Sequence, residues 1–256
     1  IVSGWDRGSF LDGTYKYAEA SAPDKLGPTG RIKFGTESEG GFRNVTISNI
    51  VFAHCRGLAL EPVDGGFLED MTITNLVMRD TVNSPIFLRL GARMRAPAGV
   101  PIGALRRVTI SNVRAYNADA RYGSILSGMP GYAIEDVKLN DIRIYYQGGG
   151  TKEQAARVPP ENEKGYPEPS MFGDMPSYGF FIRHMQGLEM NNVEVSTLKE
   201  DLRPAFVLED VKGAEFNNVK AQTAPGVSAF VLKDVEKFVV RNSSAPDAKL
   251  DNVKEK

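Results

Sequence analysis

An internal repeat constrains the fold of this chain more than any other feature of its sequence. Residues 42–50, FRNVTISNI, recur as LEDMTITNL at 68–76 and as LRRVTISNV at 105–113, and looser copies follow. An asparagine or aspartate holds the same place in each copy, at positions 49, 75, 112, 141, 192, 218 and 242. Apart from two insertions the period is about 24–29 residues, which is typical of stacked supersecondary units.

A second element accompanies each copy, a short apolar segment between turn signals. Examples are GLALE at 57–61, PIFLR at 85–89 and AFVLE at 205–209. These segments are rich in β-branched and aromatic residues and are too short for helices, so they predict strands. Short strands repeated without helical segments predict an all-β protein, specifically a right-handed parallel β-helix (a solenoid) that forms a single domain over residues 1–256.

Two insertions, 91–104 and 147–177, interrupt the repeat. The first is rich in Gly, Pro and Arg and carries Arg93 and Arg95. The second has three consecutive glycines and many prolines, and carries Tyr166 and Phe172. Long loops on a rigid scaffold often carry specificity, which is the first interpretation. A surface lobe or an oligomer contact is the second.

The recurring asparagine has a structural explanation in a parallel β-helix. Stacked at one turn, each side chain would bond the equivalent side chain one coil away, at the strand spacing of roughly 4.8 Å. We therefore expect a structural ladder of side chains that contains Asn49, Asn75, Asn112, Asn192 and Asn218.

Alignment of the short strands on their central apolar residue predicts two columns of side chains. The inward column is Leu11, Ile32, Leu60, Leu88, Leu126, Ile182, Leu208 and Leu232. The outward column is made of the next residue in each strand, Asp12, Lys33, Glu61, Arg89, Ser127, Arg183, Glu209 and Lys233. Most of the outward column is expected to be a solvated face. Its first half, joined by Arg31, Arg93 and Arg95, is alternatively the floor of a cationic cleft.

Two cations of this region, Arg31 and Lys33, flank Ile32 on one predicted strand. In a strand they point to the same side, with their charged ends roughly 6–7 Å apart, which suits one anionic sugar or two neighbouring ones. An ordinary solvated strand face is the alternative for this pair taken alone.

Composition excludes several classes of function. The chain has 31 basic and 32 acidic residues, which argues against a general nucleic-acid binder. One cysteine and two histidines exclude an internal disulfide and a Cys/His zinc cluster, and we expect neither a metal nor a cofactor. Cys55 is expected to be a small buried residue, and His54 and His184 are expected to be structural or rim residues.

No apolar run approaches the roughly 18 residues of a membrane-spanning helix. The chain also has no signal peptide, and it begins at Ile1 rather than at a methionine. We therefore expect a processed chain or a part of a longer one.

The tripeptide Arg31-Ile32-Lys33, followed by coils of the N-V-T-I-S-N type, resembles glycoside hydrolase family 28, the polygalacturonase-like pectinases. The resemblance covers essentially the whole chain and matches the C-terminal portion of bacterial members. It implies a secreted or periplasmic protein that takes part in the inverting hydrolysis of α-linked galacturonic acid polymers. It also implies that Arg31 and Lys33 bind the carboxylate of the sugar at the cleavage point. Further substrate-binding candidates are Arg7, Glu61, Arg89 and Arg93.

The chain lacks the catalytic motifs of that family. Inversion needs carboxyl groups roughly 6.5–9.5 Å apart, which the family supplies as N-T-D and D-D motifs. Neither motif occurs here, and where the family has G-H-G this chain has DRGSFLDG at 6–13, with Arg7 in place of the histidine. Asp12 is the one acid retained as a possible substitute, because acids with perturbed pKa values cluster in clefts. We predict that this chain by itself is inactive on polygalacturonate.

Two other classes of protein fit parts of this pattern. A non-catalytic carbohydrate-binding or adhesin-type β-solenoid would show the same repeat, with Arg31 and Lys33 as surface charges. A calcium-dependent pectate lyase would need clustered Asp and Glu ligands on neighbouring coils, and the sequence shows no such cluster. The choice between homogalacturonan and rhamnogalacturonan, exo or endo action, and the oligomeric state stay open.

Overall fold

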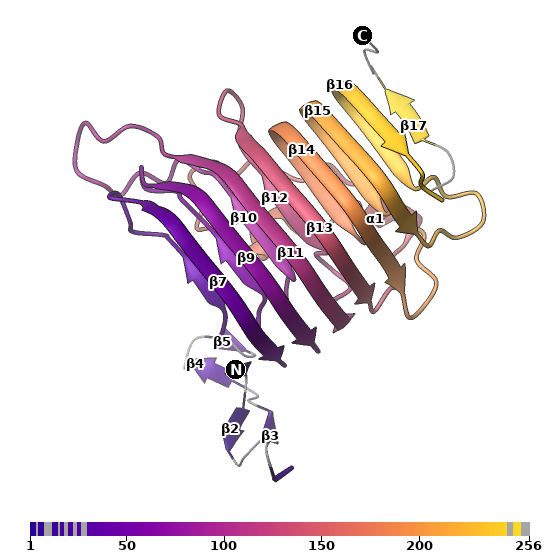
Figure 1. Cartoon of the computed structure of the whole chain (residues 1–256), viewed down its shortest axis with the longest axis horizontal. Helices are drawn as coiled ribbons and strands as arrows, with labels where there is room; N and C mark the ends of the chain where they lie inside the picture. The colour runs from indigo at the N-terminus through magenta and orange to yellow at the C-terminus, as the bar shows by residue number, and fades with distance from the viewer. Residues whose placement is uncertain are drawn as a thin grey trace.

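The computed structural model describes residues 1–3, 12–14 and 30–244 in full, and the short strands at 5–7, 16–17, 20–22, 25–26 and 248–251 through their backbone. The fold is all-β, as predicted (Figure 1). Its principal strands are β6 (Ile32–Phe34), β7 (Phe42–Ala53), β8 (Leu58–Leu60), β9 (Phe67–Arg79), β10 (Ile86–Arg89), β11 (Ala104–Ala118), β12 (Ser124–Ser127), β13 (Ile134–Tyr146), β14 (Phe180–Thr197), β15 (Phe206–Ala221) and β16 (Phe230–Arg241).

The remaining elements are short. At the two ends of the chain they are β1 (Val2–Ser3), β2 (Trp5–Arg7), β3 (Lys16–Tyr17), β4 (Ala20–Ala22), β5 (Lys25–Leu26) and β17 (Ala248–Asp251). Strand β1 extends the main sheet beside β7, whereas β2 with β3 and β4 with β5 form two antiparallel pairs. The second insertion contains one turn of helix, α1 (Lys152–Ala155), and a 3-10 turn at Pro169–Phe172.

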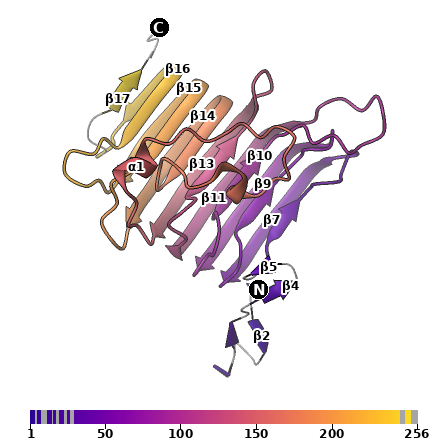
Figure 2. The same ribbon diagram turned by 180° about the vertical axis from the view of Figure 1, so that it is seen from behind.

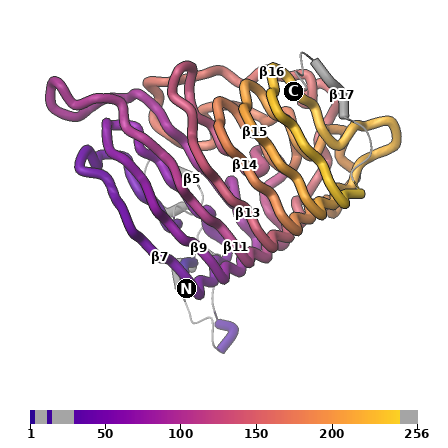
Figure 3. The backbone as a smooth tube through the Cα atoms, turned by 45° about the horizontal axis from the view of Figure 1, so that its top comes forward, coloured from indigo at the N-terminus to yellow at the C-terminus, as the bar shows by residue number. Residues whose placement is uncertain are grey.

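The principal strands pair in parallel, in two stacks. The short-strand stack contains β6, β8, β10 and β12, followed by the first residues of β14, β15 and β16. The long-strand stack contains β7, β9, β11 and β13, followed by the later residues of the same three strands. Because β14 pairs with both β12 and β13, the stacks join into one sheet, of 13 strands within the described residues, that bends round and nearly closes on itself (Figures 1 and 3).

The predicted repeats are confirmed as register partners in the long-strand stack. Thr46 lies beside Thr72, Thr72 beside Thr109, and Thr109 beside Lys138. Since side chains alternate along each strand, this register places every copy of the repeat with the same face inward.

The asparagine ladder is confirmed. Its residues also adopt a left-handed backbone conformation, which the sequence pattern did not predict. Asn75 Nδ2 donates to Asn49 Oδ1 at 2.9 Å, Asn112 Nδ2 donates to Asn75 Oδ1 at 2.8 Å, and Asn218 Nδ2 donates to Asn192 Oδ1 at 3.1 Å. The ladder residues have positive φ, for example 59° at Asn75. Asparagine tolerates this left-handed conformation better than most residues, so one residue type both turns the chain and bonds its neighbour.

The predicted inward column forms the core of the short-strand stack. Its six members from β8 onward are completely buried and follow one another in register: Leu60, Leu88, Leu126, Ile182, Leu208 and Leu232. Leu11 lies outside the described residues. Toward the C-terminal end, Phe180, Phe206 and Phe230 stack with ring centroids 5.9 and 4.8 Å apart, which extends the same core.

The predicted register of β6 is wrong by two residues. Ile32 pairs with Leu58, not with Leu60, which instead pairs with Phe34. In this register Gly35 packs closely against Glu61: its φ is +105°, and an added β-carbon would lie 2.2 Å from the carbonyl oxygen of Glu61. Glycine thus permits a close approach that strand patterning does not encode. Because side chains alternate with a period of two, Lys33 stays on the outward face.

The outward column is solvated at its two ends, where Asp12 and Lys233 are exposed, but its middle part is not the solvated face that we expected. The insertion 147–177, which we call the strap, runs across the outer side of the short-strand stack (Figure 2). Its Phe172 packs into a second apolar cluster with Phe87, Ile125 and Phe181. Members of the column beneath the strap are consequently buried, namely Glu61, Arg89, Ser127 and Arg183.

The first insertion, 91–104, lies against the strap. The amide of Ala92 donates to the carbonyl oxygen of Glu163 in the strap at 2.7 Å, and the amide of Met94 donates to the carbonyl oxygen of Val63 at 3.1 Å. The two insertions therefore meet over the start of the short-strand stack, where the sequence had predicted a cleft.

Candidate functional site

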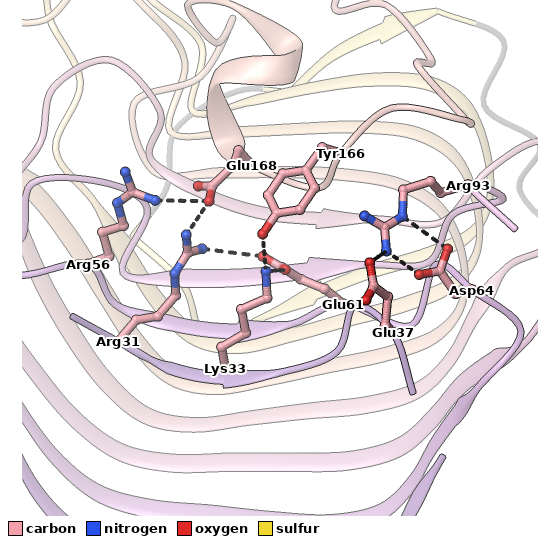
Figure 4. Close-up of polar contacts among 9 residues, drawn as sticks. All are labelled: Arg31, Lys33, Glu37, Arg56, Glu61, Asp64, Arg93, Tyr166 and Glu168. Carbon is pink, nitrogen blue, oxygen red and sulfur yellow. Dashed lines mark hydrogen bonds and ion pairs between the residues drawn. The ribbon is translucent and has the colours of Figure 1, made fainter. Parts of the chain in front are cut away.

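The candidate site is a row of cations on the outer side of the short-strand stack, which we call the basic face. It consists of Arg31, Lys33, Arg56, Arg89, Arg93 and Arg183. Four of these six were predicted as substrate-binding residues, Arg183 was predicted only as part of the outward column, and Arg56 was not predicted at all. The strap covers the row and supplies several of its partners (Figures 2 and 4).

Arg31 and Lys33 point to the same side, as the strand pattern predicted, and each holds a carboxylate (Figure 4). Lys33 Nζ lies 2.7 Å from Glu61 Oε2, and Arg31 Nη1 lies 3.4 Å from Glu61 Oε1. Arg31 Nη2 also donates to Oε1 of Glu168, which comes from the strap. The pair is thus a carboxylate-binding arrangement that is occupied by acids of this chain.

Tyr166 of the strap lies directly over Lys33. Lys33 Nζ donates to the tyrosine hydroxyl at 3.0 Å and lies 4.8 Å from the ring centroid. The guanidinium of Arg93 lies 5.5 Å from the same ring. One aromatic side chain of the strap therefore spans two of the predicted binding cations, through contacts of the cation–π type.

Glu61 is the most strongly perturbed acid of the site. Its side chain is fully buried, and burial raises the pKa of its carboxyl group to about 7, although the charges of Lys33 and Arg31 act in the opposite direction. Removing a carboxylate from water costs more here than two nearby cations return. Glu61 therefore exchanges its proton close to neutral pH, so its own charge, and with it the strength of its ion pairs with Arg31 and Lys33, changes with pH in this range.

Glu168 bridges two arginines. Its Oε1 accepts from Nη2 of Arg31 and from Nη1 of Arg56, the latter at 2.9 Å. The side chains of all three residues are at least four-fifths buried, so water screens these ion pairs only partly. This carboxylate ties the strap to the start of the short-strand stack.

Arg93, from the first insertion, is paired in the same way. It forms a forked interaction with both carboxylate oxygens of Asp64 and lies 3.2 Å from Glu37 Oε1. Burial by itself would raise the pKa of Asp64, but the hydrogen bond from Arg93 and that from the Arg95 amide lower it. Asp64 is therefore a stable carboxylate that keeps Arg93 in place.

Arg89 and Arg183 lie deepest under the strap. Arg89 donates to the carbonyl oxygen of Glu161 at 2.7 Å and to Oγ of Ser127 at 2.9 Å. Arg183 donates to the carbonyl oxygen of Pro159 at 2.9 Å and lies 3.0 Å from a carboxylate oxygen of Glu161. Burial, together with the charge of Arg183, lowers the pKa of Arg89 to about 10. These two arginines hold the strap backbone rather than facing solvent.

The two predicted residues near the N-terminus have different outcomes. Arg7 ends strand β2, and its side chain lies outside the described residues. Asp12 lies exposed in a turn, where its carboxylate accepts from the amide of Thr14 at 2.9 Å and from its hydroxyl at 2.6 Å. These hydrogen bonds lower the pKa of Asp12, which favours the carboxylate and disfavours a role as a general acid.

Cys55 and His184 occupy structural positions. Cys55 is buried, its Sγ donates to the carbonyl oxygen of Val2 at 3.2 Å, and burial raises the pKa of its thiol to about 11, so the thiolate is not available at neutral pH. His184 is nearly buried, with Nδ1 lying 2.7 Å from Asp210 and Nε2 lying 3.1 Å from Glu161.

The arrangement as a whole can bind carboxylates but presents no open acid–base pair. Each cation of the basic face contacts carboxylate or carbonyl oxygens of the chain itself. Within the described residues no group of three His, Cys, Asp or Glu side chains is placed to hold a metal ion. In the same part of the chain no helix has the length and apolar character needed to cross a membrane.

The sequence identified four of the six cations of the basic face as binding residues, together with Glu61, but not the other partners of these cations. Glu168, Arg56 and Asp64 were missed, since Glu168 stands 137 residues from Arg31 in the chain and no local pattern links them. One feature of the sequence did indicate that another segment covers the outer side of the short strands. Consecutive apolar residues such as Ile86 and Phe87 mark a strand that is buried on both faces, and only the inward face was assigned.

Comparison with known proteins identifies no relative of this chain. No protein-family model matches the chain, and no curated protein or solved structure matches it at a significant level.

Proposed function

We propose that this chain is the carboxylate-binding part of a pectin-active glycoside hydrolase, built as a right-handed parallel β-helix. One observation carries the proposal: Arg31, just before strand β6, and Lys33, within it, each hold a carboxylate in a partly buried, aromatic-lined position. A galacturonic acid unit offers the same carboxylate, with a sugar ring that can lie against Tyr166. Arginine and lysine side by side suit such an anionic sugar.

On this proposal Glu168 occupies the place of a sugar carboxylate, and ligand binding requires the strap to move. Glu168 reaches Arg31 and Arg56 from a loop rather than from the sheet, so an incoming uronate can replace it without rearranging the stack. The cost of displacing it is offset by the equivalent ion pair that the ligand forms. The remaining cations of the basic face would then contact neighbouring sugars of the polymer.

We assign no role in bond cleavage to the residues of the basic face. Inversion needs two carboxyl groups on opposite sides of the sugar, one of them protonated. Glu61 has a pKa suited to a general acid, but its side chain is fully buried beneath the strap and is paired with Lys33. We therefore propose that the described residues bind the substrate, and that the chain alone does not hydrolyse it.

A galacturonic acid oligomer tests the proposal directly. If it binds at the basic pair, it displaces the strap, so trypsin should cleave more quickly after Lys164, which lies exposed in the strap. The double substitution Arg31→Gln, Lys33→Gln should abolish this ligand-induced change. Arg107→Gln is the matched control, because it removes one arginine that is paired with Asp70 on the long-strand stack. Equal acceleration of cleavage in the double variant, or none in the native chain, would refute the proposal.

A non-catalytic carbohydrate-binding or adhesin-type solenoid is the second candidate. It is favoured by one observation, that the basic face is already covered by the strap and neutralised by the acids of the chain. In that case the strap is a permanent part of the fold. The oligomer would then leave the rate of strap cleavage unchanged in every variant.

A further inference from the structure

A second candidate binding surface lies on the long-strand stack, where β9, β11 and β13 end side by side (Figure 1). A groove of about 330 Å³ opens there, and none of its lining residues belongs to the strap or to the basic face. Its lining includes Val77, Arg79, Arg114, Tyr116, Arg143 and Tyr145.

The floor of this groove is aromatic and exposed. Tyr116 and Tyr145 are register partners on neighbouring strands, and their ring centroids lie 5.9 Å apart with an angle of 52° between the rings. Tyr116 is 55% exposed and Val77 is 50% exposed. Tyrosine presents an apolar ring face and a polar hydroxyl, and a pyranose ring has a matching C–H face bordered by hydroxyl groups.

The walls of the groove carry positive charge. Arg114 and Arg143 are register partners two residues before the tyrosines, so they share the same face of the sheet. Like charges in this position repel each other. Arg143 lies 2.9 Å from Glu194, whereas Arg114 donates to the carbonyl oxygens of Val113 and Asp141 and has no carboxylate partner among the described residues.

A third arginine, Arg79, adds to the excess of positive charge in the groove. Arg79 lies beside Tyr116 in register, and among the described residues its one carboxylate contact is with Asp80, where Nε lies 3.9 Å from Oδ2. Lys220 follows Glu194 in the column that contains Arg114 and Arg143. The groove therefore concentrates positive charge on a chain whose formal net charge is −1, which creates a local preference for an anionic ligand.

We propose that this groove binds an acidic polysaccharide, with sugar rings on Tyr116 and Tyr145 and sugar carboxylates on Arg114 and Arg143. Adjacent strands are about 4.8 Å apart, which gives each successive sugar of an extended chain its own tyrosine and arginine. The ligand class follows from the side chains of the groove, independently of the basic face. A single-stranded nucleic acid, whose bases also stack on exposed aromatic side chains, is the alternative ligand that the experiment below has to exclude.

Calorimetric titration of the full chain with a galacturonic acid oligomer tests the inference. Tyr116→Ala and Arg114→Gln should each weaken binding to the groove about tenfold, which is the loss expected for one charge-assisted or aromatic contact. Both side chains are exposed, so the unfolding temperature should stay unchanged. Arg107→Gln, on the same strand but outside the groove, is the matched control. An uncharged galactose oligomer of the same length should bind more weakly than the acidic one.

The outcomes separate this inference from the proposed function. In the chain with Arg31→Gln and Lys33→Gln, binding that persists and is weakened by Tyr116→Ala establishes the groove. Binding that is lost in that double variant, and is insensitive to Tyr116→Ala and Arg114→Gln, overturns the groove and leaves the basic pair in place. Displacement of the oligomer by a lower concentration of single-stranded RNA would also overturn it, in favour of a nucleic-acid ligand.

Discussion

Substitution of Glu61 by glutamine should change how the stability of this protein depends on pH. The Glu61 carboxyl group is fully buried and lies 2.7 Å from Lys33 Nζ and 3.4 Å from Arg31 Nη1. Glu168 is the other acid that acts on it. Burial is the largest influence and raises the pKa of Glu61 from 4.5 to about 7 in the folded chain. The folded state consequently favours the protonated acid more than the unfolded state does.

The sign and size of the effect follow from proton linkage. Between pH 4.5 and about 7 the folded chain binds more protons at Glu61 than the unfolded chain, so the free energy of unfolding falls as the pH rises. The pKa difference corresponds to about 3 kcal/mol, which is fully present below pH 4.5 and is lost by the time the pH has passed about 7. Glutamine has the same shape and stays uncharged, so the variant lacks this dependence.

Urea denaturation of the native chain and of Glu61→Gln, at a series of pH values from about 5 to 8, measures the difference directly. We expect the stability of the variant relative to the native chain to rise by about 2.5 kcal/mol across this range, because part of the effect lies below pH 5. Glu69→Gln is the matched control. Glu69 is nearly buried and is paired with three arginines, but its pKa is lowered, so its contribution is lost only at pH values below the range of the experiment.

A flat difference for Glu61→Gln would refute the reasoning. If the variant were less stable than the native chain by a constant 3–5 kcal/mol, Lys33 and Arg31 would be keeping Glu61 ionised throughout the range. Burial would then be the weaker of the two effects at this site.

Three further predictions concern the strap, the chemistry and the ladder. Glu168→Gln should strengthen binding of a galacturonic acid oligomer in calorimetric titration, because Arg31 and Arg56 lose their internal carboxylate, whereas Glu153→Gln, an exposed acid of the same strap, should leave it unchanged. Incubation of the chain with polygalacturonate should release no reducing ends; release that disappears on Asp12→Asn would contradict the assignment of binding without catalysis. Asn75→Ala should cost about 3 kcal/mol in urea denaturation, from two hydrogen bonds and a strained left-handed backbone, and Asn75→Gly about 1 kcal/mol less.

Several features of the fold follow from the sequence because they depend on its period. The copies at 42–50, 68–76 and 105–113 became register partners, since strands of equal pattern bury the same face when they pair in parallel. The asparagine ladder and the buried column from Leu60 to Leu232 follow from the same regularity. The register of β6 did not follow from it, and this register includes a close backbone contact at Gly35 that only a glycine permits.

In the candidate site, too, some features follow from the sequence pattern and others depend on tertiary contacts. By itself the sequence determined which cations share a face, since alternation along a strand places Arg31 and Lys33 together whatever the rest of the chain does. Only the tertiary structure decided what these cations bind. Glu168 and Tyr166 arrive from a strap more than 130 residues away in the chain. No sequence period predicts the path of the strap. That path depends on contacts with the folded sheet, such as the packing of Phe172 in its apolar cluster and the hydrogen bond from Arg89 to the carbonyl oxygen of Glu161. The charge state of Glu61 was decided at the same stage, since burial and not residue type sets its pKa.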